Sequence, residues 1–152
     1  MKVKIKKLNE KAQMPFKAHL DDAGFDLFAT SKEYDKYQNI VYGTGLAFEI
    51  PQGYVGLIFP RSSNAKKDMI LTNCIGVIDS CYRGEVLFKF KRLLTHSNFI
   101  ERTWYDGREY EVGDRIGQII IMPYPSIEFE EVDKLSDTDR GDGGYGSTDK
   151  IS

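Results

Sequence analysis

The 152-residue sequence lacks the features of a zinc, redox, membrane or nucleic-acid-binding protein. It has only two cysteines and two histidines, and neither pair has CxxC or HExxH spacing. No apolar run approaches the roughly 20 residues that span a bilayer. The formal net charge of −2 provides no basic field for a nucleic-acid backbone. We therefore expect a cytoplasmic protein with reduced thiols, bound to no membrane and no polymeric nucleic acid, whose metal arrives with a substrate.

Short strand patterns separated by turn residues predict an all-β fold. Residues 54–59 form a continuous apolar run, and apolar residues alternate with others over 86–91, as expected for strands. A further strand is expected at 119–122, ended by Pro123, which lacks an amide hydrogen. One short helical turn is expected at 62–67, with its serines capping the first free amides.

The chain is predicted to form one domain, residues 1–135, followed by an arm, residues 136–152. The segment 139–150 carries four glycines and almost no apolar surface, so burial cannot order it and we expect it to be flexible until a ligand holds it. Within 101–110, the Asp106-Gly107 pair favours a two-residue hairpin turn.

Two segments carry groups that suit a phosphorylated ligand. Pro60-Arg61-Ser62-Ser63 brings a guanidinium, two hydroxyls and free helix amides to one point, where an anion is stabilised. The arm combines glycines with Arg140, Tyr145, Ser147 and Thr148, which could wrap phosphates. Taken alone, each segment is better explained by the simpler alternative, an ordinary helix start for 60–63 and a flexible terminus for the arm.

A third segment, residues 73–86, is predicted to bring Asn73, Asp79 and Tyr82 together in one hairpin. The amide could pair with a base edge, the carboxylate could hold a water molecule, and the ring could face a sugar. A purely structural hairpin, with Asp79 and Ser80 as turn residues, is the alternative.

In order and spacing, five blocks resemble the trimeric deoxyuridine triphosphatase (dUTPase) family. The blocks lie at 23–27, 60–63, 73–86, 113–118 and 140–148. Each is short, and their occurrence together in this order carries the resemblance. It implies a distorted jelly-roll (β-clip) domain that assembles as a homotrimer with active sites shared between subunits.

The resemblance also implies the reaction, hydrolysis of dUTP to dUMP and pyrophosphate, which limits uracil in DNA and supplies dUMP. Asp79 matches the residue that orients the water attacking the α-phosphorus, and Asp26 matches a residue that supports the site. Mg²⁺ is expected to ride on the phosphates through water, with no direct protein ligand and with Asp26 as a candidate outer-shell contact.

The remaining matched positions are substrate-binding. Eight of them match family positions that lie at or near the phosphates: Arg61, Ser62, Ser63, Gln118, Arg140, Gly146, Ser147 and Thr148. Uracil is expected to meet the Asn73 side chain and the main chain of Gly76, Val77 and Ile78, the deoxyribose to pack on Tyr82, and the base to stack on Tyr145 as the arm closes.

Some positions depart from the family pattern: Ser63 replaces glycine, Tyr145 replaces phenylalanine, Asp149 adds an acid, and the stretch 93–112 is longer than usual. Two other functions remain as alternatives. A dCTP deaminase of the same fold would carry its catalytic glutamate about where Lys89 stands. A nucleotide-dependent interaction protein would bind a protein partner through the 93–112 hairpin.

Overall fold

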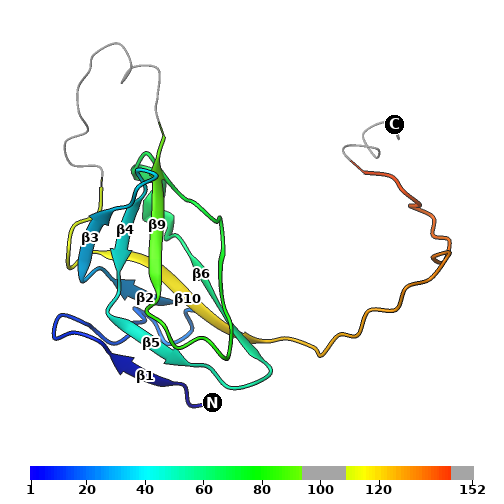
Figure 1. The fold of residues 1–152 in the computed structure, drawn as a ribbon, viewed down its shortest axis with the longest axis horizontal. Coiled ribbons are helices and arrows are strands. Elements are labelled where there is room, and N and C mark those ends of the chain that lie inside the picture. Colours follow the sequence, from blue (N-terminus) through cyan, green and yellow to red (C-terminus); the bar gives the residue numbers. More distant parts are fainter. Residues whose placement is uncertain (94–108, 145–152) are drawn as a thin grey trace, which may run out of the picture.

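The structure, a computed structural model, describes residues 1–93 and 109–144, and this part of the chain is built almost entirely from β-strands (Figure 1). In chain order the elements are β1 (Lys4–Lys7), β2 (Phe25–Phe28), β3 (Ser31–Tyr34), β4 (Ile40–Gly43), β5 (Leu46–Glu49), β6 (Tyr54–Phe59), the 3-10 helix η1 (Ser62–Lys66), β7 (Met69–Leu71), β8 (Gly76–Ile78), β9 (Leu87–Arg92) and β10 (Arg115–Pro123). The all-β expectation is confirmed. In the same residues no helix has the length and apolar character needed to cross a membrane.

The strands form two four-stranded sheets and one two-stranded sheet, with every pairing antiparallel. One sheet has the order β2-β10-β6-β8, the second has the order β3-β4-β9-β7, and β1 pairs with β5. Strands β10 and β6 run side by side from Gln118 opposite Phe59 to Pro123 opposite Tyr54. This pair forms the middle of the first sheet.

The hydrophobic core lies where the inner faces of the two larger sheets meet. Leu27, Ile58 and Ile119 come from the first sheet, and Tyr42 and Phe88 from the second, and all five are buried in one cluster. Burial of such side chains supplies most of the favourable free energy of folding. Among the described residues, no strand of one larger sheet pairs with a strand of the other, so side-chain packing holds the two sheets together.

The longest predicted strands are confirmed, with small differences at their ends. β6 occupies 54–59 as expected, and β9 buries Phe88 and Phe90 while exposing the residues between them. β10 begins at Arg115, earlier than expected, and includes Pro123, and the next amide, that of Tyr124, still donates to the carbonyl of Gly53 at 3.0 Å.

The helical turn is present as η1, but the predicted serine caps are wrong. Arg61 occupies the N-cap position, and no side chain caps the helix there. The hydroxyl of Ser63 instead accepts a hydrogen bond of 3.2 Å from Nη1 of Arg61. η1 must therefore be fixed by contacts outside its first turn.

The segment 73–86 is not a hairpin paired within itself. Strand β8 pairs across to β6, with Val77 opposite Leu57, and residues 79–86 form turns and irregular chain. The prediction of a hairpin was wrong because a three-residue strand takes its partner from the sheet, which its local sequence does not specify.

The chain leaves the sheets after β10. All residues from Met122 to Asp142 are exposed, and the segment extends away from the body (Figure 1). Its exposed apolar side chains include Ile127, Phe129 and Leu135.

Candidate active site

The carboxylate of Asp26, which binds two arginines, marks the first half of the candidate site. Nε of Arg61 donates to Oδ1 of Asp26 at 2.8 Å, and Nη1 of Arg115 donates to Oδ2 at 3.1 Å. The side chain of Asp26 is only 15% exposed, against 41% for Arg115. Each carboxylate oxygen thus holds one guanidinium, and the two cations keep donors available for an anion.

Three elements bring these groups together. Asp26 lies on β2, which pairs with β10 so that Gln118 is opposite Asp26. Gln118 is also opposite Phe59 at the end of β6, just before Arg61. The middle strand of the sheet therefore places the carboxylate and the helix start side by side.

The Gln118 side chain fits against Gly24. A Cβ atom at Gly24 would lie 2.2 Å from Oε1 of Gln118, so a larger residue there would displace the amide. Nε2 of Gln118 donates to the carbonyl of Pro60 at 3.2 Å. The glycine lets the amide side chain support the turn that carries Arg61.

These residues line a cavity of about 340 Å³. Its walls are Ala18, Asp22, Ala23, Gly24, Asp26, Arg61, Ser62, Arg115, Gln118 and Ile120. We call it the anion pocket, because two arginines, a hydroxyl and a carboxamide face it.

Arg115 was missed by the sequence prediction, and the geometry explains why. In a regular strand, residues 115 and 118 point to opposite faces, because side chains alternate. The β10–β2 register shifts between Arg115 and Gly117, so that Ile116 and Gly117 are both buried. This bulge turns Arg115 toward the same pocket as Gln118.

A second pocket, of about 250 Å³, lies on the other flank of β6. Its lining residues are Ile58, Asn73, Gly76, Val77, Ile78, Asp79, Tyr82, Glu85 and Leu87. We call it the base pocket. The sequence prediction that Asn73, Asp79 and Tyr82 meet is confirmed, although the hairpin expected to join them is absent.

The loop entering the base pocket contains a residue with unusual backbone geometry. Cys74 has φ of 58°, a left-handed conformation uncommon for residues other than glycine. Its amide donates to Leu71 at 3.0 Å, and the amide of Ile75 donates to the carbonyl of Asn73 at 2.5 Å. The turn sets the direction in which Asn73 leaves the backbone.

The wall of the base pocket is shaped by a second glycine and a glutamate. A Cβ atom at Gly76 would lie 2.4 Å from Ile58 and 3.2 Å from Nδ2 of Asn73. Oε1 of Glu85 accepts a hydrogen bond of 2.7 Å from the Gly45 amide, which ties this wall to the chain before β5. The sequence prediction did not single out Glu85.

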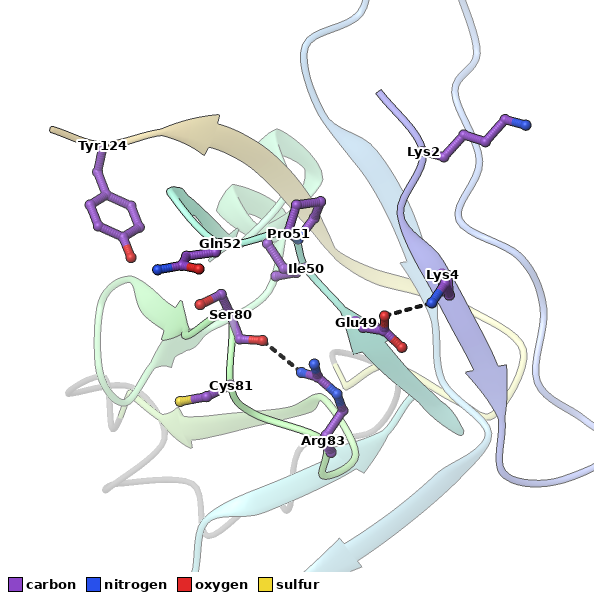
Figure 2. Close-up of a pocket in the computed structure, with 10 residues that line it drawn as sticks. All are labelled: Lys2, Lys4, Glu49, Ile50, Pro51, Gln52, Ser80, Cys81, Arg83 and Tyr124. Carbon is purple, nitrogen blue, oxygen red and sulfur yellow. Dashed lines mark hydrogen bonds and ion pairs between the residues drawn. The ribbon is translucent and has the colours of Figure 1, made fainter. Parts of the chain in front are cut away.

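The turn that carries Asp79 also borders a cavity of about 630 Å³ (Figure 2). Nη1 of Arg83 donates to the carbonyl of Ser80 at 2.6 Å and to that of Tyr82 at 2.9 Å. The amide of Tyr82 donates to the carbonyl of Asp79 at 3.0 Å. Arg83 is thus used to stiffen the turn.

Arg140, the predicted arm contact that the structure describes, lines neither pocket. Nε of Arg140 donates to the carbonyl of Gly143 at 3.0 Å, and Arg140 is exposed. The predicted contacts Tyr145, Gly146, Ser147 and Thr148, and the hairpin predicted within 101–110, lie outside the described residues, except for Glu109 and Tyr110.

No group of three or more metal-ligating side chains occurs among residues 1–93 and 109–144. Asp26 is a carboxylate in the lining of the anion pocket, and both of its oxygens already accept hydrogen bonds from arginine. This arrangement suits a water-mediated contact better than direct coordination of Mg²⁺, which holds its water tightly.

The two pockets define a class of protein: an all-β protein with an anion pocket and a second, smaller pocket on opposite flanks of one strand. The dUTPase family model matches residues 10–149. The deoxyuridine 5'-triphosphate nucleotidohydrolase of Nautilia profundicola is 43% identical, covering 99% of this chain and 100% of the relative. That of Corynebacterium glutamicum is 39% identical, covering 99% and 96%.

Solved structures agree. The dUTPase of Staphylococcus bacteriophage 80alpha with dUpNHpp has a TM-score of 0.77 and 28% identity, covering 96% of this chain and 97% of that one. A mutant dUTPase of phage phi11 of S. aureus, with a structural Mg(II) ion, has a TM-score of 0.72 and 25% identity, covering 89% and 99%. The chain belongs to the dUTPase family, as the five blocks predicted.

Proposed function

We propose that the protein hydrolyses dUTP to dUMP and pyrophosphate. The observation that carries the proposal is the pairing of the anion pocket, around Asp26 and Arg61, with the base pocket, around Asn73 and Asp79, in a chain of the dUTPase family. We assign the triphosphate to the anion pocket and the nucleoside to the base pocket.

The anion pocket would hold the triphosphate. Arg61 presents its guanidinium with its direction already fixed by Asp26, and Ser62 and Gln118 line the same cavity. Donors fixed before the substrate arrives stabilise charge that develops during reaction, because they need no reorganisation. Arg140 and the arm residues 145–148 would add further donors as the arm closes.

Asp79 would act as the general base. Its carboxylate would accept a proton from water as the water oxygen bonds to the α-phosphorus. The bond from that phosphorus to the bridging oxygen breaks, and pyrophosphate leaves with the electron pair. Mg²⁺, carried by the phosphates and water with Asp26 as an outer-shell contact, would neutralise part of the phosphate charge.

Selection of deoxyuridine would come from the base pocket. The Asn73 side chain and the main chain of Gly76 to Ile78 present donors and acceptors to one base edge, and cytosine would leave one of them unpaired at a cost of about 1–3 kcal/mol. The Tyr82 hydroxyl donates to the Glu85 carbonyl at 3.1 Å. This bond would hold the ring in a position that leaves no room for the 2′-hydroxyl of a ribose.

We further propose that the domain is a distorted jelly roll acting as a homotrimer with shared sites. The two pockets have no lining residue in common, and they lie beside β10 and β8, the opposite neighbours of β6. The exposed apolar side chains after β10, such as Ile127 and Phe129, support contact with another subunit.

One assay separates the candidates. Purified protein would be given dUTP, dCTP, dTTP and UTP with and without Mg²⁺, while pyrophosphate and ammonia are measured. Pyrophosphate from dUTP alone, dependent on Mg²⁺, is the expected result. Ammonia from dCTP would favour the deaminase instead. The position expected for the deaminase's catalytic glutamate holds Lys89, which is exposed on β9 with its Nζ 3.4 Å from Asp35. No release from dUTP would reject the proposal.

A further inference from the structure

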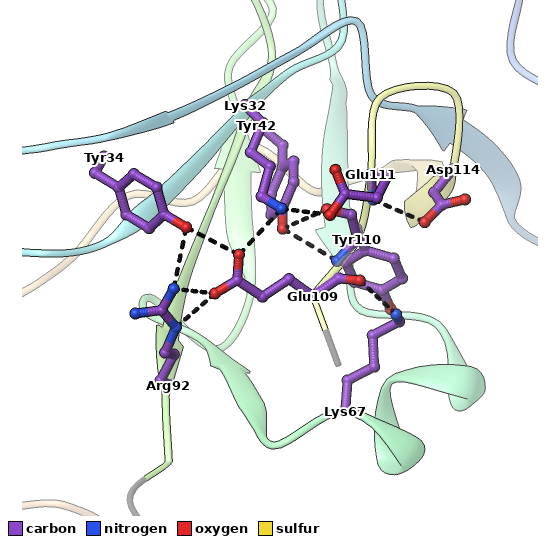
Figure 3. Close-up of polar contacts among 9 residues, drawn as sticks. All are labelled: Lys32, Tyr34, Tyr42, Lys67, Arg92, Glu109, Tyr110, Glu111 and Asp114. Atoms are coloured by element: carbon purple, nitrogen blue, oxygen red, sulfur yellow. Dashed lines mark hydrogen bonds and ion pairs between the residues drawn. The ribbon is translucent and has the colours of Figure 1, made fainter. Parts of the chain in front are cut away.

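A cluster of polar contacts anchors the chain where the described residues resume at Glu109 (Figure 3). The Glu109 carboxylate accepts hydrogen bonds from Nε of Arg92 at 2.5 Å and from the Tyr34 hydroxyl at 3.0 Å. Nζ of Lys32 lies 3.1 Å away. Burial alone would raise the pKa of Glu109, but the hydrogen bonds from Arg92, Lys32 and Tyr34 outweigh it and lower the pKa. Glu109 is therefore held as a carboxylate against β3 and β9.

The next residue, Tyr110, is fixed in the core. Tyr110 is only 3% exposed, and its ring centroid lies 5.7 Å from that of Phe90. Its amide donates to the Tyr42 hydroxyl at 3.1 Å, and that hydroxyl donates to the Tyr110 carbonyl at 3.0 Å. The position of the Tyr110 ring is thus set by the second sheet.

From this fixed position, two contacts reach η1. The Tyr110 hydroxyl donates to Oδ1 of Asn64 at 3.3 Å. Nζ of Lys67, at the C-cap of η1, donates to the Glu109 carbonyl at 2.8 Å and lies 4.6 Å from the centre of the Tyr110 ring. The middle and the end of the helix are both held by residues 109 and 110.

The charge of Arg61, which lines the anion pocket, also acts on the phenol. Burial raises the pKa of Tyr110, and a hydrogen bond from Ser63 and the positive charge of Arg61 act in the opposite direction. The hydroxyl bonds to Asn64 in the middle of η1. The helix has no side-chain cap of its own, and the backbone amide of Asn64 donates to the Arg61 carbonyl at 2.9 Å, so this contact links the core to the turn that carries Arg61.

We infer that Tyr110 is a positioning residue for phosphate binding: its buried hydroxyl fixes η1 so that Arg61 and Ser62 face the anion pocket. The inference rests on the proposed function, since it assigns the residue to the same site. Tyr110 lines neither the anion pocket nor the base pocket and acts through Asn64.

The test is Tyr110→Phe, which keeps the ring and its packing and removes the hydroxyl. Binding of pyrophosphate with Mg²⁺ and binding of deoxyuridine would each be measured by calorimetry. Loss of a neutral hydrogen bond predicts pyrophosphate affinity weakened about threefold to tenfold. Deoxyuridine, which lacks phosphates, should bind within twofold of the wild type. A purely structural role would weaken both ligands or neither, and either result would overturn the inference.

Tyr34→Phe is the matched control. It removes a hydroxyl from the same cluster, bonded to Glu109 and to Arg92, but not to η1. Pyrophosphate affinity should remain within twofold of the wild type. An effect equal to that of Tyr110→Phe would assign the role to the cluster as a whole and reject Tyr110 as the specific link.

A double-mutant cycle with Asn64→Ala gives an independent test. If the hydroxyl acts through Asn64, the double variant should bind pyrophosphate no more weakly than Asn64→Ala alone. Additive effects would contradict the inference, and the cycle remains decisive if Tyr110→Phe lowers stability. Because pyrophosphate binding is measured without turnover, a wild-type protein inert toward dUTP would reject the proposed function separately.

Discussion

The Arg61 guanidinium and the Asp26 carboxylate form a partly buried ion pair, with Nε of Arg61 2.8 Å from Oδ1 of Asp26. The pair joins β2 to the turn after β6, and the other carboxylate oxygen holds Arg115. One carboxylate therefore sets the direction of two cations. A buried charge pair of this kind acts mainly through geometry, because desolvation offsets much of its Coulombic energy.

Asp26→Asn should impair catalysis without unfolding the protein. Asparagine keeps the shape but loses the charge, and hydrogen bonds to charged groups contribute about 1.5–3 kcal/mol. We expect kcat/KM for dUTP to fall about tenfold to a hundredfold. Steady-state kinetics would measure it. Glu49→Gln, which breaks the exposed Lys4–Glu49 pair, should leave kcat/KM within about twofold; an equal loss in both variants would rule out a specific role for Asp26.

Asp79→Asn should separate binding from turnover. The amide cannot take the proton from water, and removal of a general base lowers rates by about a hundredfold to ten-thousandfold. Single-turnover kinetics with dUTP would give the rate, and calorimetry with dUpNHpp would give the affinity. Binding should be retained. A variant with unchanged kcat would exclude Asp79 as the base.

Removal of residues 140–152 should leave a folded but poorly active protein. The described residues before this point keep both sheets and both pockets, whereas Arg140 and the predicted phosphate contacts are lost. Loss of such donors lowers kcat by about a hundredfold or more. Circular dichroism should match that of the full chain. Full activity of the truncated chain would show that the arm plays no part in catalysis.

Gly117→Ala should lower stability through overpacking. A Cβ atom at Gly117 would lie 2.0 Å from Cε1 of Phe88, which is fully buried. Such overpacking costs about 1–3 kcal/mol, measurable as a lower Tm. Gly144→Ala, where a Cβ atom would meet open space, is the control and should leave Tm unchanged. The double variant with Phe88→Leu should recover part of the loss, and its failure to do so would contradict the packing explanation.

Glu109 should make stability depend on pH in the acid range. Its pKa in the folded protein is lowered from 4.5, so the unfolded chain binds the proton more tightly. The stabilisation is therefore complete above the unfolded pKa of 4.5 and is lost as pH falls through the lower folded value. Glu109→Gln should cost about 1–3 kcal/mol at pH 7. Urea unfolding at several pH values should show the two proteins converging in acid; a constant difference would contradict this.

The sequence predicted the strands whose pattern is carried by their own residues. β6 is apolar throughout, and β9 alternates buried and exposed residues. β3, with the sequence SKEY, has no such alternation, because it lies at a sheet edge and takes its form from pairing with β4. Short edge strands of this kind are set by tertiary contacts.

The candidate site was predictable where a residue's position follows from the five blocks. Asn73, Asp79 and Tyr82 meet in one pocket as expected. Arg115 was not predicted, because its orientation depends on a bulge in β10. Tyr110 was not predicted either, because its contact with Asn64 joins residues that are far apart in the sequence.

The pairing of Arg92 with Glu109 has a consequence for how the chain can vary. These residues stand on either side of the stretch 93–108, and their ion pair closes its two ends on the surface of the second sheet. Closing a loop of greater length adds little entropy cost once its ends are fixed, since that cost rises only with the logarithm of length. A change in the number of residues between Arg92 and Glu109 is therefore expected to cost little stability as long as this ion pair is kept.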